Sequence, residues 1–148
     1  LAGLSATVAY FEELGQMGSL SDDRRTRIVT AYKMSRDYEE PLTNTLIDGL
    51  SQITGVSIYG ITNPNRVNHR VPTVSIRVKN VSPSDMTSAL ASKSIHVWHG
   101  HNYAYEPARA LGLPLNEGVL RIGFAHYNTI DDVTSILHEI QKTVIKTK

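Results

Sequence analysis

Apolar residues recur at every second position in two stretches of the chain, residues 72–78 and 118–124. The apolar positions of these two stretches are Val74, Ile76, Val78, Leu120, Ile122 and Phe124. A period of two is that of a strand with one buried face, so we predict a strand in each stretch. Arg121 lies between two of these positions, and we therefore expect it on the opposite face of the sheet.

Apolar residues at helical spacing predict helices elsewhere. The expected helices are at residues 2–14, at about residues 22–52, from Ser82 onward, at residues 105–111 and from about residue 130. Leu4, Ala91 and Ile130 are among the residues that this spacing places in buried stripes. Pro41 lies inside the long second helix, which we expect to kink or restart near residues 38–41. Two further short strands are predicted at residues 56–61 and 95–98.

From residue 55 onward the predicted order is β-β-α-β-β-α. Because strands and helices mix without regular βαβ alternation, we predict an α+β fold. Its small, mostly antiparallel sheet would carry helices on one face and leave the other face, with Arg121, open. The helix at residues 21–53 is too long for the interior of a domain of this size, so we expect it to link two domains. A first helical pattern without a cap suggests a chain cut from something longer.

Composition excludes several classes of function. The formal net charge of +1 over 148 residues argues against binding nucleic acid or a membrane surface through bulk charge. No apolar run approaches the roughly 20 residues that a membrane span needs, and no signal peptide is evident, so we expect a cytoplasmic protein. The absence of cysteine excludes disulfides, thiolate metal sites and a thiol nucleophile.

The densest group of potential metal ligands consists of His96, His99, His101, Glu106 and His126. His99-Gly-His101 followed by Glu106 imitates the metal motif of cupin barrels, in which two histidines project from one strand face. Cupins need many short strands, whereas long helical patterns occupy both ends of this chain. We therefore interpret these histidines as the lining of a polar cleft and keep a His-rich, metal-dependent enzyme as an alternative.

Arg121 allows two interpretations. It is either a surface arginine on a half-exposed strand or a guanidinium that a rigid strand holds in place to clamp a carboxylate with two parallel hydrogen bonds. The residues of its own strand do not decide between the two.

Three segments resemble a known family. VSIYGI, then RVPTVSIRVKNVSPSDMTSALASKSIHVWHGHNYAYEPARALGL, then GVLRIGFAHYNTIDDVTSIL are similar to the C-terminal (small) domain of the class V aminotransferase and cysteine desulfurase-like family of fold-type I pyridoxal-phosphate enzymes. A sequence motif that is typical of this family precedes its last helix. The residues of this motif here are Arg121, Tyr127, Asn128, Thr129, Asp132 and Val133. In the family this arginine binds the α-carboxylate of the substrate. The resemblance thus assigns Arg121 to substrate binding, with His99, His101 and Tyr103 as further contacts from a closing loop.

The resemblance also implies how the chain is divided. Residues 1–20 would be the end of the large cofactor-binding domain, residues 21–53 the linking helix and residues 54–148 the small domain. Pyridoxal 5'-phosphate would be bound by the missing large domain, because none of the six lysines stands in the family's lysine motif. We accordingly expect no catalytic residue in this chain, an amino acid as substrate, and a homodimer as the full-length enzyme.

One departure from the family limits the reaction. The desulfurase loop has the form R-x-G-H-x-C, and the corresponding residues here are Trp98, Gly100, His101 and, at the cysteine position, Tyr103. A persulfide mechanism that uses this loop is therefore excluded, while lyase, transaminase and epimerase chemistry remain open. The alternative to an enzyme is a non-catalytic binding or oligomerisation module with an α+β sheet.

Overall fold

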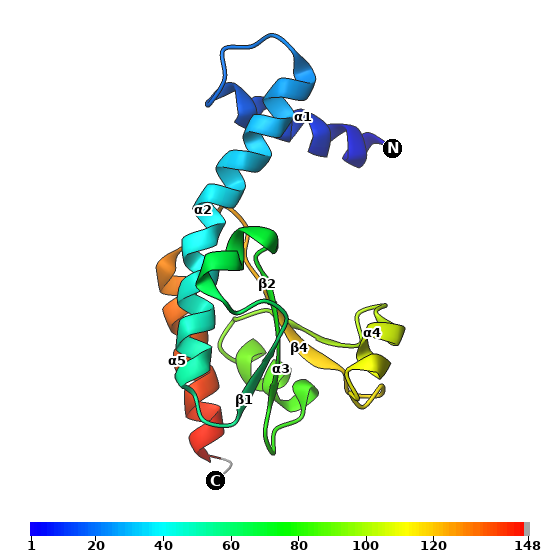
Figure 1. The fold of residues 1–148 in the computed structure, drawn as a ribbon, viewed down its shortest axis with the longest axis vertical. Coiled ribbons are helices and arrows are strands. Elements are labelled where there is room, and N and C mark those ends of the chain that lie inside the picture. The colour runs from blue at the N-terminus through cyan, green and yellow to red at the C-terminus, as the bar shows by residue number, and fades with distance from the viewer. Residues whose placement is uncertain (147–148) are drawn as a thin grey trace.

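Two helices form an arm that stands off a small sheet domain (Figure 1). The structure is a computed structural model that describes residues 1–146. The arm consists of α1 (Ala2–Gln16) and the first part of α2 (Arg24–Gln52), and the rest of α2 lies against the sheet domain beside α5 (Ile130–Lys146). No helix within the described residues combines the length and the apolar character that a membrane crossing requires. The sequence also predicts a basic end for the last helix, with Lys142, Lys146 and Lys148, and of these Lys148 lies outside the described residues.

The long helix α2 runs unbroken through Pro41. It begins where the Asp23 carboxylate accepts a hydrogen bond from the Thr26 backbone N–H at 2.8 Å. The predicted restart near residues 38–41 is wrong. Pro41 and Asp37, four residues before it, are both exposed, so water can reach the carbonyl that the proline leaves unbonded.

The sheet has four strands in the order β1-β2-β4-β3, and every neighbouring pair is antiparallel. The strands are β1 (Val56–Tyr59), β2 (Thr73–Val78), β3 (Trp98–Gly100) and β4 (Val119–Gly123). The shorter helices are the 3-10 helix η1 (Pro64–His69), α3 (Pro83–Ala91) and α4 (Tyr105–Ala110). The predicted α+β class is confirmed, as are the strands at residues 72–78 and 118–124.

The hydrophobic core lies between one face of the sheet and three helices, α2, α3 and α5. Its buried side chains include Leu42, Leu46, Leu50, Val74, Ile76, Met86, Leu90, Leu120, Ile122, Val133, Ile136 and Ile140. Apolar positions of the strands therefore face the helices as their alternation predicts. The opposite face carries the polar positions, and the segment around α4 projects on that side (Figure 1).

The third strand lies later in the chain than predicted. Ile95 and Val97 do pack against the core, but β3 begins only at Trp98. After α3 the chain reverses at Ser94, whose φ is 59°, and the Ile95 N–H is bonded back to the Leu90 carbonyl at 3.1 Å. Residues 95–97 are thus used to leave the helix, and the chain reaches the edge of β4 afterwards.

Other burial predictions also fail, for local reasons. Leu4, Ala91 and Ile130 are exposed, because they lie at or near helix ends beyond the reach of the core. Val119 lies two positions from Arg121 and thus on the same face of β4, yet it is buried, and Ala108 and Leu113 of the α4 segment line the same cavity as Val119.

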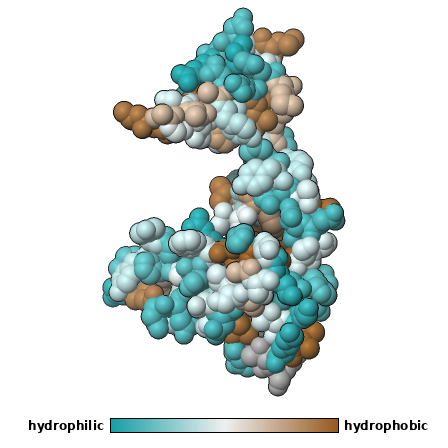
Figure 2. Space-filling view, turned by 180° about the vertical axis from the view of Figure 1, so that it is seen from behind, coloured by the Kyte–Doolittle hydropathy of each residue, from teal (hydrophilic) through white to brown (hydrophobic). Residues whose placement is uncertain are grey.

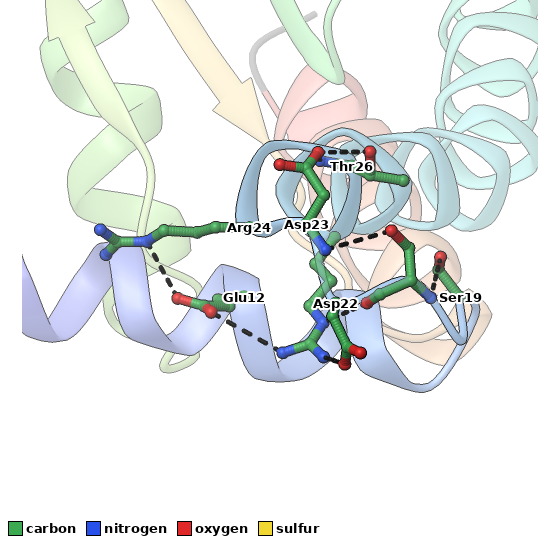
Figure 3. A network of polar contacts seen from close by, with 8 residues as sticks. Glu12, Ser19, Asp22, Asp23, Arg24 and Thr26 are labelled. Carbon is green, nitrogen blue, oxygen red and sulfur yellow. Dashed lines mark hydrogen bonds and ion pairs between the residues drawn. The ribbon is translucent and has the colours of Figure 1, made fainter.

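The arm is held by a close contact between α1 and α2 and by charged side chains. Glu12 lies 3.0 Å from Arg24 and 3.8 Å from Arg27, and Arg27 also contacts the Asp22 carboxylate at 2.9 Å (Figure 3). Gly15 is the only buried residue of α1. Apolar surface remains at the N-terminal tip of the arm (Figure 2), where Leu1 and Leu4 are exposed.

Gly15→Ala should loosen α1 from α2. A Cβ at this position would lie 1.8 Å from the Arg27 carbonyl oxygen, and a backbone atom cannot rotate away. We expect amide hydrogen exchange in α1 to become at least about tenfold faster, equivalent to roughly 1.4 kcal/mol of lost protection.

Gly3→Ala is the matched control for this substitution, because nothing lies within 4 Å of a Cβ at Gly3. Its exchange rates should be unchanged or slower, since alanine is the better helix former. Equal exchange rates in the two variants would show that the contact at Gly15 does not hold the arm.

Candidate functional site

A row of four side chains crosses the open face of the sheet. Tyr59 pairs with Ser75, Ser75 with Arg121, and Arg121 with Trp98, so each of the four strands contributes one residue. Residues directly opposite one another on neighbouring strands project from the same face. The row therefore holds Arg121 between Ser75 and Trp98, on the side away from α2, α3 and α5.

A cavity of about 520 Å³ opens at the β3 end of this row. It is lined by Thr73, His96, Val97, Trp98, Asn102, Tyr103, Arg121 and Gly123. Among these residues Arg121 is the only arginine or lysine, and there is no aspartate or glutamate. The cavity therefore presents one fixed positive charge to a ligand.

The guanidinium of Arg121 has no partner in the described part of the chain. No hydrogen bond or ion pair joins it to another of residues 1–146. The side chain is exposed, and its backbone belongs to strand β4. Arg77, on the same face, differs: its guanidinium lies 2.6 Å from a Glu117 carboxylate oxygen and donates to the Gly118 carbonyl at 2.7 Å. Arg77 is thus a structural residue, whereas all N–H donors of Arg121 remain available to a ligand.

The four predicted site residues lie in three different places. Tyr103 lines the cavity of Arg121, and His101 instead lines a neighbouring apolar cavity of about 260 Å³, with its ring edge-on to Tyr105 at 6.0 Å. His99 lines neither cavity, and it pairs with Leu120 in the sheet, one position out of register with Arg121. The substrate-binding roles of all four residues stay predictions.

Sequence reasoning placed His96 only among the histidines of a polar cleft, and it did not assign Trp98 or Asn102 to the binding site. The signal was present for the first two, because a core-facing Ile95 and Val97 place His96 and Trp98 on the opposite side of an extended segment. No comparable pattern marks Asn102, which comes to the cavity through the turn after β3.

The loop after β3 holds Tyr103 at the cavity in an unfavourable backbone conformation. Asn102 and Tyr103 have φ values of 52° and 61°, a left-handed conformation that typically costs about 1–3 kcal/mol for a non-glycine residue. The Asn102 side-chain amide donates to the Gly100 carbonyl at 2.9 Å, which stabilises the turn. The loop is therefore held in a defined shape beside Arg121.

Residues 125–132 form the corner between β4 and α5. The Asn128 side-chain oxygen accepts from the Ala125 N–H at 2.9 Å, and the Asp132 carboxylate accepts from the Thr129 N–H at 2.8 Å. This second bond is the main reason that the pKa of Asp132 lies below its usual value. The side chains of the Tyr-Asn-Thr…Asp motif thus stabilise the turn that follows β4, the strand of Arg121.

A second polar cluster joins the arm to the sheet domain. The Tyr10 hydroxyl is hydrogen-bonded to His126 Nε2, and His126 Nδ1 lies 3.9 Å from a Glu39 carboxylate oxygen. Burial raises the pKa of the Glu39 carboxyl, and the nearby His126 opposes this shift. Within residues 1–146 no three His, Asp or Glu side chains gather as metal ligands, so the geometry offers no support for the metalloenzyme alternative.

Comparison with known proteins gives a consistent family. The family model described as Aminotransferase class-V matches residues 27–136. The aminotransferase-like protein FGM3 of Gibberella zeae is 31% identical over 103 residues, which cover 68% of this chain and 25% of that protein. A probable cysteine desulfurase of Staphylococcus aureus is 24% identical over 141 residues, or 95% of this chain and 29% of the relative.

Solved structures show the same fold. The apo cysteine desulfurase from Thermococcus onnurineus NA1 superimposes with a TM-score of 0.70 at 24% identity, covering 83% of this chain and 30% of that one. The cysteine desulfurase CsdA from Escherichia coli gives a TM-score of 0.64 at 19% identity and covers 86% of this chain and 32% of that one. The chain spans between 25% and 29% of the length of the two curated relatives described above.

Proposed function

The chain belongs to the aminotransferase class-V family, and on that premise we propose that it is the substrate-binding part of a pyridoxal-phosphate-dependent lyase or transferase that acts on an amino acid. The observation that carries this proposal is the unpartnered guanidinium of Arg121 in the cavity of the open sheet face. A planar guanidinium binds a carboxylate through two parallel hydrogen bonds, and a strand holds it with little loss of freedom on binding. Arg121 would therefore bind and orient the α-carboxylate.

The cofactor would be held by another part of the enzyme. Lys33, Lys79, Lys93, Lys142 and Lys146 are the lysines of the described residues, and none of them lines the cavity of Arg121. The residues present therefore do not fit a site for the cofactor itself. Pyridoxal phosphate, when bound, supplies an electron sink for cleavage of a bond at the substrate's α-carbon. The exposed apolar residues at the tip of the arm support the view that a further domain or subunit covers them.

The loop after β3 would close over the substrate without acting as a nucleophile. Tyr103 stands where the resembling desulfurases carry a cysteine, and a phenol cannot take up sulfur as a persulfide. The reaction would accordingly differ from persulfide-forming desulfuration. A homodimeric, cytoplasmic enzyme is part of the same proposal, by analogy with the family.

The proposal can be tested on the chain itself, because Trp98 is its only tryptophan and lines the cavity. N-acetyl-L-alanine and its amide are titrated while Trp98 fluorescence is followed. We expect the acid to bind at least about tenfold more tightly than the amide, which is the preference that one charge-assisted pair confers. Arg121→Ala should remove that preference.

The matched control is Arg109→Ala, since the Arg109 guanidinium is exposed on α4 and lines no part of this cavity. It should keep the preference for the acid. Equal binding of acid and amide to the wild-type chain would contradict the proposed function and favour a non-catalytic module.

A further inference from the structure

Two large aromatic rings beside Arg121 have no partner. Trp98 and Tyr103 are 71% and 101% exposed, and neither ring stacks on another ring or joins a side-chain hydrogen bond in the part of the chain that the structure describes. Other rings in this chain do find partners, as Phe11 and Tyr32 stack with centroids 4.8 Å apart. Both unpartnered rings line the same cavity as the free guanidinium.

The position of Trp98 relative to Arg121 is set by the sheet. The two residues are direct partners in the antiparallel pairing of β3 with β4. Opposite side chains on neighbouring strands start about 4.5–5.5 Å apart. A ligand whose carboxylate meets the guanidinium of Arg121 must therefore place its adjoining atoms alongside the Trp98 ring.

The rest of the lining suits a flat apolar group better than a charged one. Val97, which also packs against the core, borders the cavity, and Gly123 adds no side chain that would fill the space. The remaining lining residues, Thr73, His96 and Asn102, carry polar side chains without a carboxylate. No carboxylate lines the cavity to attract a second cation, and no lysine or further arginine would attract a second anion. A volume of about 520 Å³ is ample for a ring the size of a phenyl or indole group.

We propose that this cavity recognises an α-carboxylate that carries an aromatic side chain, with Trp98 and Tyr103 as the specificity-determining residues that cover the ring. The inference rests on the proposed function, in which Arg121 binds the carboxylate. The ring of the ligand stacks against or edge-on to Trp98, as aromatic pairs prefer. Tyr103, which follows the turn that the Asn102–Gly100 hydrogen bond stabilises, covers the other side and keeps water from the charge pair.

The experiment compares N-acetyl-L-phenylalanine with N-acetyl-L-alanine on the isotopically labelled chain. Binding is followed by nuclear magnetic resonance at the Gly123 backbone amide and the Arg121 side-chain N–H, so no tryptophan signal is needed. We expect the Kd of N-acetyl-L-phenylalanine to be at least about tenfold lower than that of N-acetyl-L-alanine, equivalent to about 1.4 kcal/mol of binding free energy. Trp98→Leu should reduce this ratio to less than about threefold, and Trp98→Phe should restore most of it.

Tyr105→Leu is the matched control, because Tyr105 is an exposed ring of the same segment that does not line this cavity. The Tyr105→Leu variant should keep the full ratio between the Kd of N-acetyl-L-alanine and that of N-acetyl-L-phenylalanine. Urea unfolding of each variant checks that the exposed positions leave the fold intact.

The outcomes separate the two proposals. If both acids bind with equal affinity and still require Arg121, the aromatic preference is overturned and the proposed function stands. If neither acid shows binding that depends on Arg121, the proposed function and this inference fall together. A preference that survives Trp98→Leu and is lost in Tyr105→Leu would place the ring elsewhere and overturn the inference alone.

Discussion

Arg121→Ala lowers kcat/KM by roughly 30- to 1000-fold in an enzyme that combines this chain with the cofactor-binding part. A guanidinium–carboxylate pair in a site shielded from water is worth on the order of 2–4 kcal/mol, because its loss leaves the carboxylate unpaired. At about 1.4 kcal/mol per factor of ten, this energy gives the stated range. Steady-state kinetics with the amino-acid substrate measure the change.

Two readouts distinguish substrate binding from a structural role of Arg121. Arg121→Lys should not rescue the rate, because an ammonium keeps the charge but loses the planar fork. The urea midpoint and the cofactor absorbance should remain as in the wild type, since the guanidinium has no partner within the described residues. The result that would sink the assignment is an Arg121→Ala enzyme that still prefers the acid over its amide as strongly as the wild type does.

Gly118→Ala unfolds the chain or leaves it several kcal/mol less stable. Gly118 has a φ of 62°, and a Cβ there would lie 2.0 Å from the carbonyl carbon and 2.1 Å from the carbonyl oxygen of Gly100. The added Cβ belongs to the backbone of one segment and would overlap backbone atoms of the other. The two segments can therefore avoid this overlap only if β3 moves away from β4. We expect a loss of at least about 3 kcal/mol, measured by urea unfolding.

Gly112→Ala separates the two causes of this loss. Gly112 has a φ of 66°, close to that of Gly118, but nothing lies within 4 Å of a Cβ there. It should cost only the about 1–2 kcal/mol of a left-handed alanine. Equal losses in the two variants would show that the contact of Gly118 with Gly100 is unimportant.

The same contact connects stability with the site. Gly118 packs against Gly100 at the end of β3, and β3 places Trp98 opposite Arg121. A Gly118→Ala chain that still folds should therefore lose the response of Trp98 fluorescence to carboxylates. This loss would occur although Gly118 lines no part of the Arg121 cavity.

The sequence by itself determined the two central strands, the face on which Arg121 lies and the α+β class. These features depend on the alternation of apolar side chains over a few residues, as in Leu120 and Ile122, and that period is local. The capping residues around Ser82 and the Tyr-Asn-Thr corner are local as well, because each side chain bonds a backbone group three residues away.

Only the tertiary structure decided which residues share the cavity of Arg121. The pairing of β3 with β4 brings Trp98 opposite Arg121, although the two residues are 23 positions apart in the chain (121 − 98). No local sequence period encodes that register. His99, His101 and His126 look alike in sequence, yet the sheet edge, the α4 segment and the arm carry them to different surroundings. Val119 is buried although it lies on the same face of β4 as Arg121, and Ala108 and Leu113 line the same cavity as Val119. The surroundings of a side chain are determined by what packs on it, and for Trp98, His99 and His126 the neighbouring residues come from distant parts of the chain.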